Sequence, residues 1–150
     1  MRKIFLALFF VSIIISCVDK HDDITDKRTK IFSSYLKNNF SLNFPVGLHY
    51  YILVSDFGCH GCKVKTVNDL YSYIDLNRKK YFTIISADQN LIPDSLKIKT
   101  EYINDSEKKL ESLNLDLANV TLIEVKDKKI TLIKSFNPND PPITDFIKLR

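Results

Sequence analysis

The spacing of hydrophobic residues predicts a helix followed by a strand, a second helix and another strand. The first helix runs from about residue 28 to residue 39, because apolar residues recur there every three or four positions: Ile31, Phe32, Tyr35, Leu36 and Phe40. Residues 49–55 (HYYILVS) and 81–87 (YFTIISA) are dense in β-branched and aromatic residues, as buried strands are. Residues 63–76 between them carry one helical apolar stripe. This order predicts a parallel β-α-β unit.

The pattern is weaker over residues 88–115. A loop is expected over 88–94, and a short strand or an extended segment over 96–103, where polar and apolar residues alternate weakly. Asn104-Asp105-Ser106 offers a helix cap, which predicts a helix over 107–115.

The last part of the chain predicts a hairpin and a short helix. Two apolar runs, 120–125 and 129–136, are separated by three residues, which is typical of two strands joined by a tight connection. A helix over 143–149 would turn Ile143, Phe146 and Ile147 inward. A central sheet with helices on both faces would bury these elements, so we expect an α/β fold.

The first residues have the pattern of an export signal. Arg2 and Lys3 precede an apolar run of about a dozen residues, 4–15, whereas a spanning helix needs roughly 20. The chain then becomes polar at once. A short apolar region with such flanks predicts a secretory signal rather than a membrane span.

The end of this run resembles the lipobox of bacterial lipoproteins. Ile14-Ile15-Ser16-Cys17 gives apolar residues, a small residue and then a cysteine, which the resemblance makes the lipidated first residue after cleavage. We therefore expect a signal peptide over 1–16, the lipidated Cys17 with a polar tether over 17–28, and a single domain over 29–150. The expected location is the cell envelope, facing the periplasm or the exterior and attached to a membrane through the lipid. The alternative is that Cys17 only ends the apolar run.

Composition limits the function classes. The 150 residues, 45% hydrophobic and 27% charged, suit one globular domain. The net charge of +4 would fall by two on removal of Arg2 and Lys3, so it says little about partners. Because the chain has no basic stripe interleaved with aromatic residues, we expect no nucleic-acid partner. It also has no GxSxG motif and no Gly-rich phosphate loop, so a Ser/His/Asp hydrolase and a phosphate-loop protein are not expected. We expect no cofactor and a monomeric protein.

The remaining cysteines form one closely spaced pair, Cys59-His60-Gly61-Cys62. If Cys17 is lipidated, an even number of thiols is left, which suits a disulfide in an oxidising compartment. A bridge of this spacing closes too small a loop to staple a fold, so the pair is there for chemistry or is idle. It lies between the strand over 49–55 and the following helix.

A CxxC pair at a strand-to-helix junction, followed by a β-α-β-β-α order, resembles the thioredoxin family, with Cys59 to Lys63 (CHGCK) as the similar motif. The longer stretch 86–120 is similar to the insert of membrane-anchored thioredoxin-like proteins of the TlpA type. The resemblance implies a thioredoxin-like mixed sheet and thiol–disulfide exchange with protein thiols or disulfides of the envelope.

The resemblance also assigns roles to residues. Cys59 would be the nucleophile, because the positive end of a helix lowers a thiol pKa there, and Cys62 would resolve the mixed disulfide. His60 would tune the thiolate and raise the reduction potential. Gly58, Gly61, Val120 and Thr121 would face the substrate, and Gly61 replaces a proline common in thioredoxins.

Three positions depart from the family pattern. Val120 stands where the family usually has a cis-proline, and a non-proline cis bond costs about 2.5–4 kcal/mol, so a trans bond is expected. Leu53 replaces an acidic residue, with Asp56 nearer the pair on the loop, and Gly58 replaces an aromatic residue.

Two other functions stay open. The domain could be a binding module of an envelope lipoprotein whose cysteines form a quiet disulfide. It could also capture a metal through Cys59, His60 and Cys62. A zinc site usually needs four ligands, however, so we expect no bound metal. His49 is expected to open a strand, and His21 is distant in sequence.

Overall fold

A five-stranded mixed sheet forms the centre of the molecule. The computed structural model describes residues 24–148. The strands lie in the order β3-β2-β1-β4-β5, with bounds Glu101–Asn104, Phe82–Ser86, Leu48–Val54, Val120–Lys126 and Lys129–Phe136. The first three strands are mutually parallel, and β4 pairs antiparallel with both β1 and β5. The expected β-α-β unit and the hairpin are therefore confirmed.

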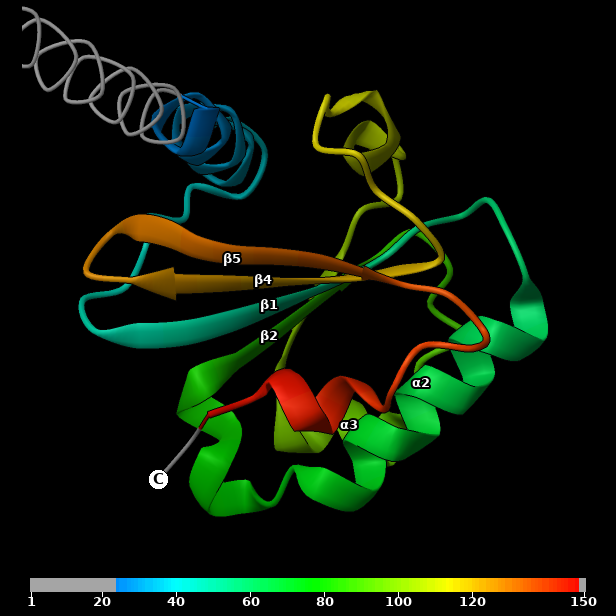
Figure 1. Cartoon of the computed structure of the whole chain (residues 1–150). Coiled ribbons are helices and arrows are strands. Elements are labelled where there is room, and N and C mark those ends of the chain that lie inside the picture. Colours follow the sequence, from blue (N-terminus) through cyan, green and yellow to red (C-terminus); the bar gives the residue numbers. More distant parts are fainter. Residues whose placement is uncertain (1–23, 149–150) are drawn as a thin grey trace, which may run out of the picture.

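Helices cover both faces of this sheet (Figure 1). A helix that occupies residues 24–40 lies on one face, where Phe32, Tyr35 and Leu36 pack against Tyr51 and Leu53 of β1. It includes residues 24–28, which the sequence assigned to a polar tether. Their charged side chains lie on the solvated side of the helix, so polarity alone did not mark them as helical.

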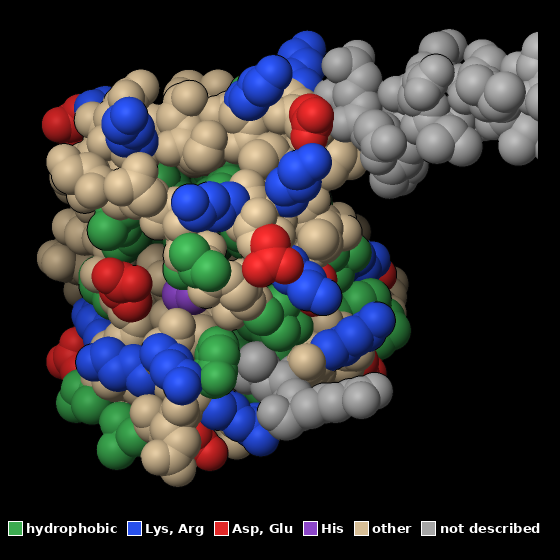
Figure 2. Space-filling view, turned by 90° about the vertical axis from the view of Figure 1, so that its left-hand side faces the viewer, with side chains coloured by type: hydrophobic (Ala, Val, Ile, Leu, Met, Phe, Trp, Pro, Cys, Tyr) green, Lys and Arg blue, Asp and Glu red, His purple; other side chains and the backbone are tan. Residues whose placement is uncertain are grey.

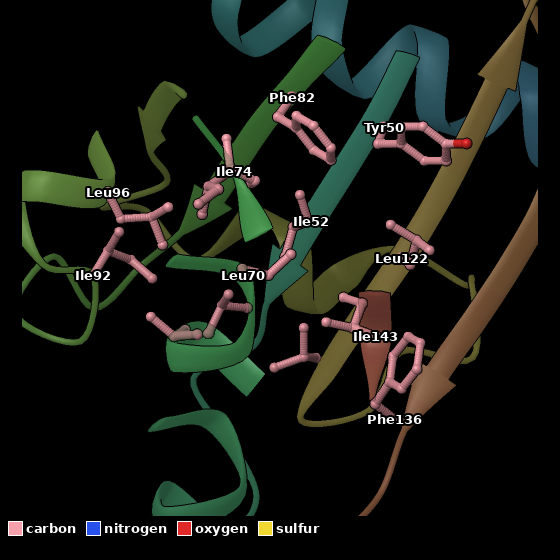
Figure 3. Packing of buried hydrophobic residues seen from close by; sticks show 14 of the residues in the cluster. Tyr50, Ile52, Leu70, Ile74, Phe82, Ile92, Leu96, Leu122, Phe136 and Ile143 are labelled. Carbon is pink, nitrogen blue, oxygen red and sulfur yellow. The ribbon is translucent and has the colours of Figure 1, made fainter. Parts of the chain in front are cut away.

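The other face is covered by α2 (His60–Tyr73), the short α3 (Asp94–Lys99) and the 3-10 turn η3 (Ile143–Phe146). Their buried side chains interlock with those of the sheet (Figure 3): Tyr50, Ile52, Leu70, Ile74, Phe82, Ile92, Leu96, Leu122, Phe136 and Ile143. Alternate residues of β1 thus serve the two cores, as the two-residue period of a strand requires. The fold is of the thioredoxin-like α/β class, as expected from the sequence.

Three expected elements were wrong in type or length. Residues 96–99 belong to α3, and only Glu101–Asn104 forms the strand β3. The helix expected over 107–115 is only the 3-10 turn η2 (Lys109–Ser112), and the last helix is only η3. Lys108 adopts the left-handed conformation (φ 53°), which prevents a regular helix from starting at residue 107.

The remaining boundaries agree closely with the expectation. Helix α2 begins three residues earlier than expected, at His60, and a 3-10 turn, η1 (Leu76–Tyr81), connects it to β2. Asp127 and Lys128 join β4 to β5, both with positive φ, as a tight two-residue hairpin turn demands. Among the described residues, no helix is both long and apolar enough to cross a membrane.

The helix over residues 24–40 should contribute strongly to stability, because its Leu36 is fully buried. We expect Leu36→Ala to lower the free energy of unfolding by about 2–5 kcal/mol, through lost burial and the cavity left behind. Urea denaturation followed by circular dichroism measures it. Ile98→Ala, at a position 62% exposed, is the control and should change stability little. Equal effects of the two variants would contradict this packing.

Candidate active site at the head of helix α2

The cysteine pair lies where β1 ends and α2 begins. Residues 55–58 form the intervening loop, and Cys59 is the N-cap residue of α2. Its Sγ accepts a hydrogen bond from the backbone N–H of Cys62 at 3.3 Å. Cys59 and Cys62 form a disulfide, with their Cα atoms 5.3 Å apart. The sulfur of Cys59 therefore lies among the unpaired N–H groups of the first helical turn.

The two cysteines differ in access to solvent. Cys59 is exposed, whereas Cys62, one turn further into the helix, is half-buried. His60 and Gly61 between them are exposed. An incoming thiol or disulfide thus reaches Cys59 more readily than Cys62. The nucleophile role expected for Cys59 and the resolving role expected for Cys62 stay predictions.

Gly58 is required by a close approach of the loop before β4. Its φ is +95°, and a Cβ built there would lie 2.1 Å from Oδ1 of Asn119. The same oxygen accepts a hydrogen bond from the backbone N–H of Cys59 at 2.6 Å. Asn119 therefore holds the cysteine loop from across the site, in the space that a side chain at position 58 would fill. No local sequence pattern points to Asn119, because the contact joins segments 60 residues apart.

Val120 and Thr121 have buried side chains. Val120 is packed in the core beneath α2, and the Thr121 hydroxyl lies between Ser135 Oγ and the backbone N–H of Ala118. If Val120 and Thr121 contact a substrate, they do so through their backbone atoms. The half-buried side chain beside the cysteines is that of Asn119. No cis peptide bond is found in residues 24–148, in agreement with the trans bond expected at Val120.

Lys63 is buried beneath the cysteine loop. Only 5% of it is exposed, and its Nζ donates hydrogen bonds to the carbonyl oxygens of Ser55, Asp56 and Phe57 at 2.9, 3.0 and 3.3 Å. Lysines are almost never this buried unless they are paired, and here backbone dipoles satisfy all three protons. The amine ties the loop to the helix that follows it. A sequence signal existed: positions 63, 67 and 70 lie on one buried helical face.

The segment around η2 holds the same loop from outside. Lys108 forms an ion pair with Asp56, and Glu111 Oε1 accepts a hydrogen bond from the backbone N–H of Asp56 at 2.6 Å. The hydrogen bond and the charge of Lys108 lower the pKa of the Asp56 carboxyl. Glu111 and Lys108 were absent from the expected site, since they lie about 50 residues from the cysteines along the chain.

Neither His49 nor His60 assembles a metal centre with Cys59 and Cys62. His49 lies in β1, buried, with Nε2 2.8 Å from the Thr83 hydroxyl, and burial lowers its pKa. It is at the opposite end of the strand from Cys59. Within residues 24–148, no group of three or more His, Cys, Asp or Glu side chains could hold a metal ion. Cys17 and His21 lie outside the described residues.

The comparisons with known proteins give no independent family assignment. No protein-family model, no curated protein and no solved structure matches this chain. The fold and the cysteine site therefore carry the functional argument.

The close contact between Gly58 and Asn119 predicts that a side chain at position 58 destabilises the protein. We expect Gly58→Ala to lower the free energy of unfolding by about 1–3 kcal/mol, because the backbone is left-handed and Asn119 must move away from the Cys59 N–H. Chemical denaturation measures the change, with the cysteines oxidised in every sample. Gly61→Ala is the matched control, since a Cβ there meets nothing within 4 Å. A loss at position 61 equal to that at 58 would refute the Asn119 contact.

Proposed function

We propose that this protein carries out thiol–disulfide exchange with other proteins through Cys59 and Cys62, and that it does so in the bacterial cell envelope from a lipid anchor at Cys17. The observation that carries the chemistry is the position of Cys59: exposed, at the N-cap of α2, with its sulfur accepting the Cys62 N–H. Groups that donate to a sulfur in this position favour its thiolate, the reactive form.

The reaction has two steps. In the reductive direction, the Cys59 thiolate attacks one sulfur of a substrate disulfide, so that a mixed disulfide forms and the substrate's other sulfur leaves as a thiolate. The Cys62 thiolate then attacks Cys59, which closes the Cys59–Cys62 bond and releases the second substrate thiolate. Two electrons pass to the substrate, whose thiolates take up protons from water. With a substrate dithiol the same steps run in reverse, and the relative reduction potentials set the direction.

The surroundings of Cys59 favour a polypeptide substrate. Phe57, half exposed, and the partly exposed Val64 lie on either side of the pair in sequence and offer apolar surface to a chain that docks there. Asn119 lies across from them, beside the strand position where the thioredoxin family has its proline. The proposed substrates are therefore protein thiols or disulfides.

The location rests on the sequence. The apolar run over 4–15 and the cysteine after Ser16 support export and lipidation. A two-cysteine pair that forms a disulfide is consistent with an oxidising compartment. The segment between β2 and β4, which adds β3 to the sheet edge, supports the finer likeness to membrane-anchored proteins of the TlpA type.

The two cysteines should give different substitution phenotypes. We expect Cys62→Ser to accumulate mixed disulfides with envelope proteins, because the resolving thiol is missing, and Cys59→Ser to form none and to lose insulin reduction. Non-reducing electrophoresis and a turbidity assay measure these outcomes. Cys17→Ser is the control: in detergent solution it should keep the exchange rate of the parent chain. Full activity of Cys59→Ser would refute the redox function, and retention of a non-covalent partner by that variant would indicate a binding module.

Lys63 should act on the cysteines through its charge and through the loop that it holds. We expect Lys63→Met to make the reduction potential more negative, because the ammonium binds the carbonyl of Phe57, two residues before Cys59, and its loss removes a positive charge that favours the thiolate. Equilibration with glutathione buffers gives the potential. Lys65→Met, at an exposed position on the same helix, is the matched control. An unchanged potential in a folded Lys63→Met protein would contradict this role.

A further inference from the structure

The end of the sheet opposite the cysteines has a distinct surface, which we call the distal end. It comprises the first turn of the helix over residues 24–40, the loop over 45–47, η1, and the hairpin connection over 126–129. The strand register brings these segments together: Leu48 at the start of β1 pairs with Lys126, and Lys126 pairs with Lys129. The backbone N–H of Asp127 donates to the carbonyl of Gly47 at 3.2 Å. Cys59 follows the other end of β1, on the order of 20 Å away along the strand.

The distal end is rich in lysine. Its exposed lysines are Lys27, Lys79, Lys80, Lys126, Lys128 and Lys129. The same segments carry two carboxylates, Asp26 and Asp127, and Asp75 is the N-cap residue just before η1. Figure 2 looks onto this end of the molecule and shows blue Lys and Arg side chains spread across it. At the cysteine end, Lys108 and Lys109 are paired with Asp56 and Glu107, and at the distal end Lys129 lies 3.8 Å from Asp26.

Three large apolar side chains project from the same segments. Val46 is 83% exposed, Leu76 65% and Ile24 54%. They come from the loop, η1 and the helix, and apolar side chains lie between the basic ones in Figure 2. Exposed apolar residues interspersed with lysines suit the interface of a bilayer, where the apolar groups enter the headgroup layer and the ammonium groups meet lipid phosphates.

The position of the anchor favours the same surface. Ile24 begins the described helix, and two residues later Asp26 lies 3.8 Å from Lys129 of the hairpin. Cys17 is seven residues before Ile24, so the connecting chain spans at most about 25 Å even when extended. A lipid on Cys17 would hold this end of the domain near the membrane.

We propose that the distal end docks on an anionic bilayer surface, so that the cysteines point away from the membrane toward envelope proteins. This inference rests on the lipid attachment proposed above. Docking adds an electrostatic attachment to the lipid anchor. Each lysine at an anionic surface raises the binding constant for the membrane roughly fivefold. It also fixes the orientation of Cys59, which a tether alone would leave free.

The test uses the full chain reconstituted into two kinds of vesicle, phosphatidylcholine alone and phosphatidylcholine mixed with phosphatidylglycerol. Lysine acetylation is followed residue by residue by mass spectrometry. We expect Lys79, Lys80, Lys128 and Lys129 to react about threefold or more slowly on the anionic vesicles, and Lys65 to react equally on both. Molar salt, with a Debye length of about 3 Å, should abolish the difference. Maleimide labelling of the reduced Cys59 should be the same on both vesicles.

A charge variant supplies the control. One variant combines four substitutions: Lys79→Gln, Lys80→Gln, Lys128→Gln and Lys129→Gln. It should stay attached to vesicles through the lipid, but its rate of acetylation at Lys126 should no longer depend on salt. Lys65→Gln combined with Lys109→Gln, at the cysteine end, should behave as the parent chain.

The outcomes separate the two proposals. Attachment with equal lysine labelling on both vesicles would overturn the docking and leave the anchor standing. If the unsubstituted chain carries no lipid at Cys17 and its distal lysines are still protected on anionic vesicles but not on phosphatidylcholine vesicles, the anchor is overturned and the docking is supported. Protection by a soluble acidic protein but not by anionic vesicles would also overturn the bilayer as the occupant.

Discussion

Strand β1 is buried on both of its faces, and the rest of the molecule is arranged to keep it so. Tyr50, Ile52 and Val54 face the core beneath α2, while Tyr51 and Leu53 face the helix over residues 24–40. A strand without a polar face must be covered on both sides and paired on both edges, since each unpaired buried N–H or C=O is costly. β2 and β4 satisfy the two edges in opposite directions. The cysteine pair follows directly from the carboxyl end of this rigid element.

The loop that carries the pair depends on contacts with three other parts of the chain. Lys63 holds the carbonyls of residues 55–57 from below, Asn119 holds the N–H of Cys59 from across the site, and Lys108 and Glu111 hold Asp56 from outside. A glycine at position 58 and an asparagine before β4 fit one another, whereas an aromatic residue at 58 would not fit beside Asn119. Gly58 and Asn119 are therefore matched to one another.

The long axis of the sheet separates two kinds of surface. The exposed Cys59 lies at one end, and the lysine-rich distal end lies at the other. Because Tyr50 and Leu48 lie near the distal end and Val54 near the cysteines, a single strand spans both. A protein held by the distal end would present its reactive thiol to the space beyond. Chemistry and attachment then occupy opposite ends of one rigid sheet.

The sequence determined the elements whose signal is local. The apolar runs over 49–55 and 81–87 contain most of β1 and all of β2, two apolar runs with a short connection indicate the hairpin, and the CxxC spacing defines the pair. Tertiary structure decided the rest. The hydrophobic periodicity of segment 96–115 is weak, so its short helix, strand and turn depend on packing against the rest of the domain. Lys63 is charged and would be solvated by itself, yet three carbonyls of one loop make its burial favourable. Asn119, Lys108 and Glu111 reach the site from positions about 50 or more residues away, and only the folded chain brings such groups within hydrogen-bonding distance.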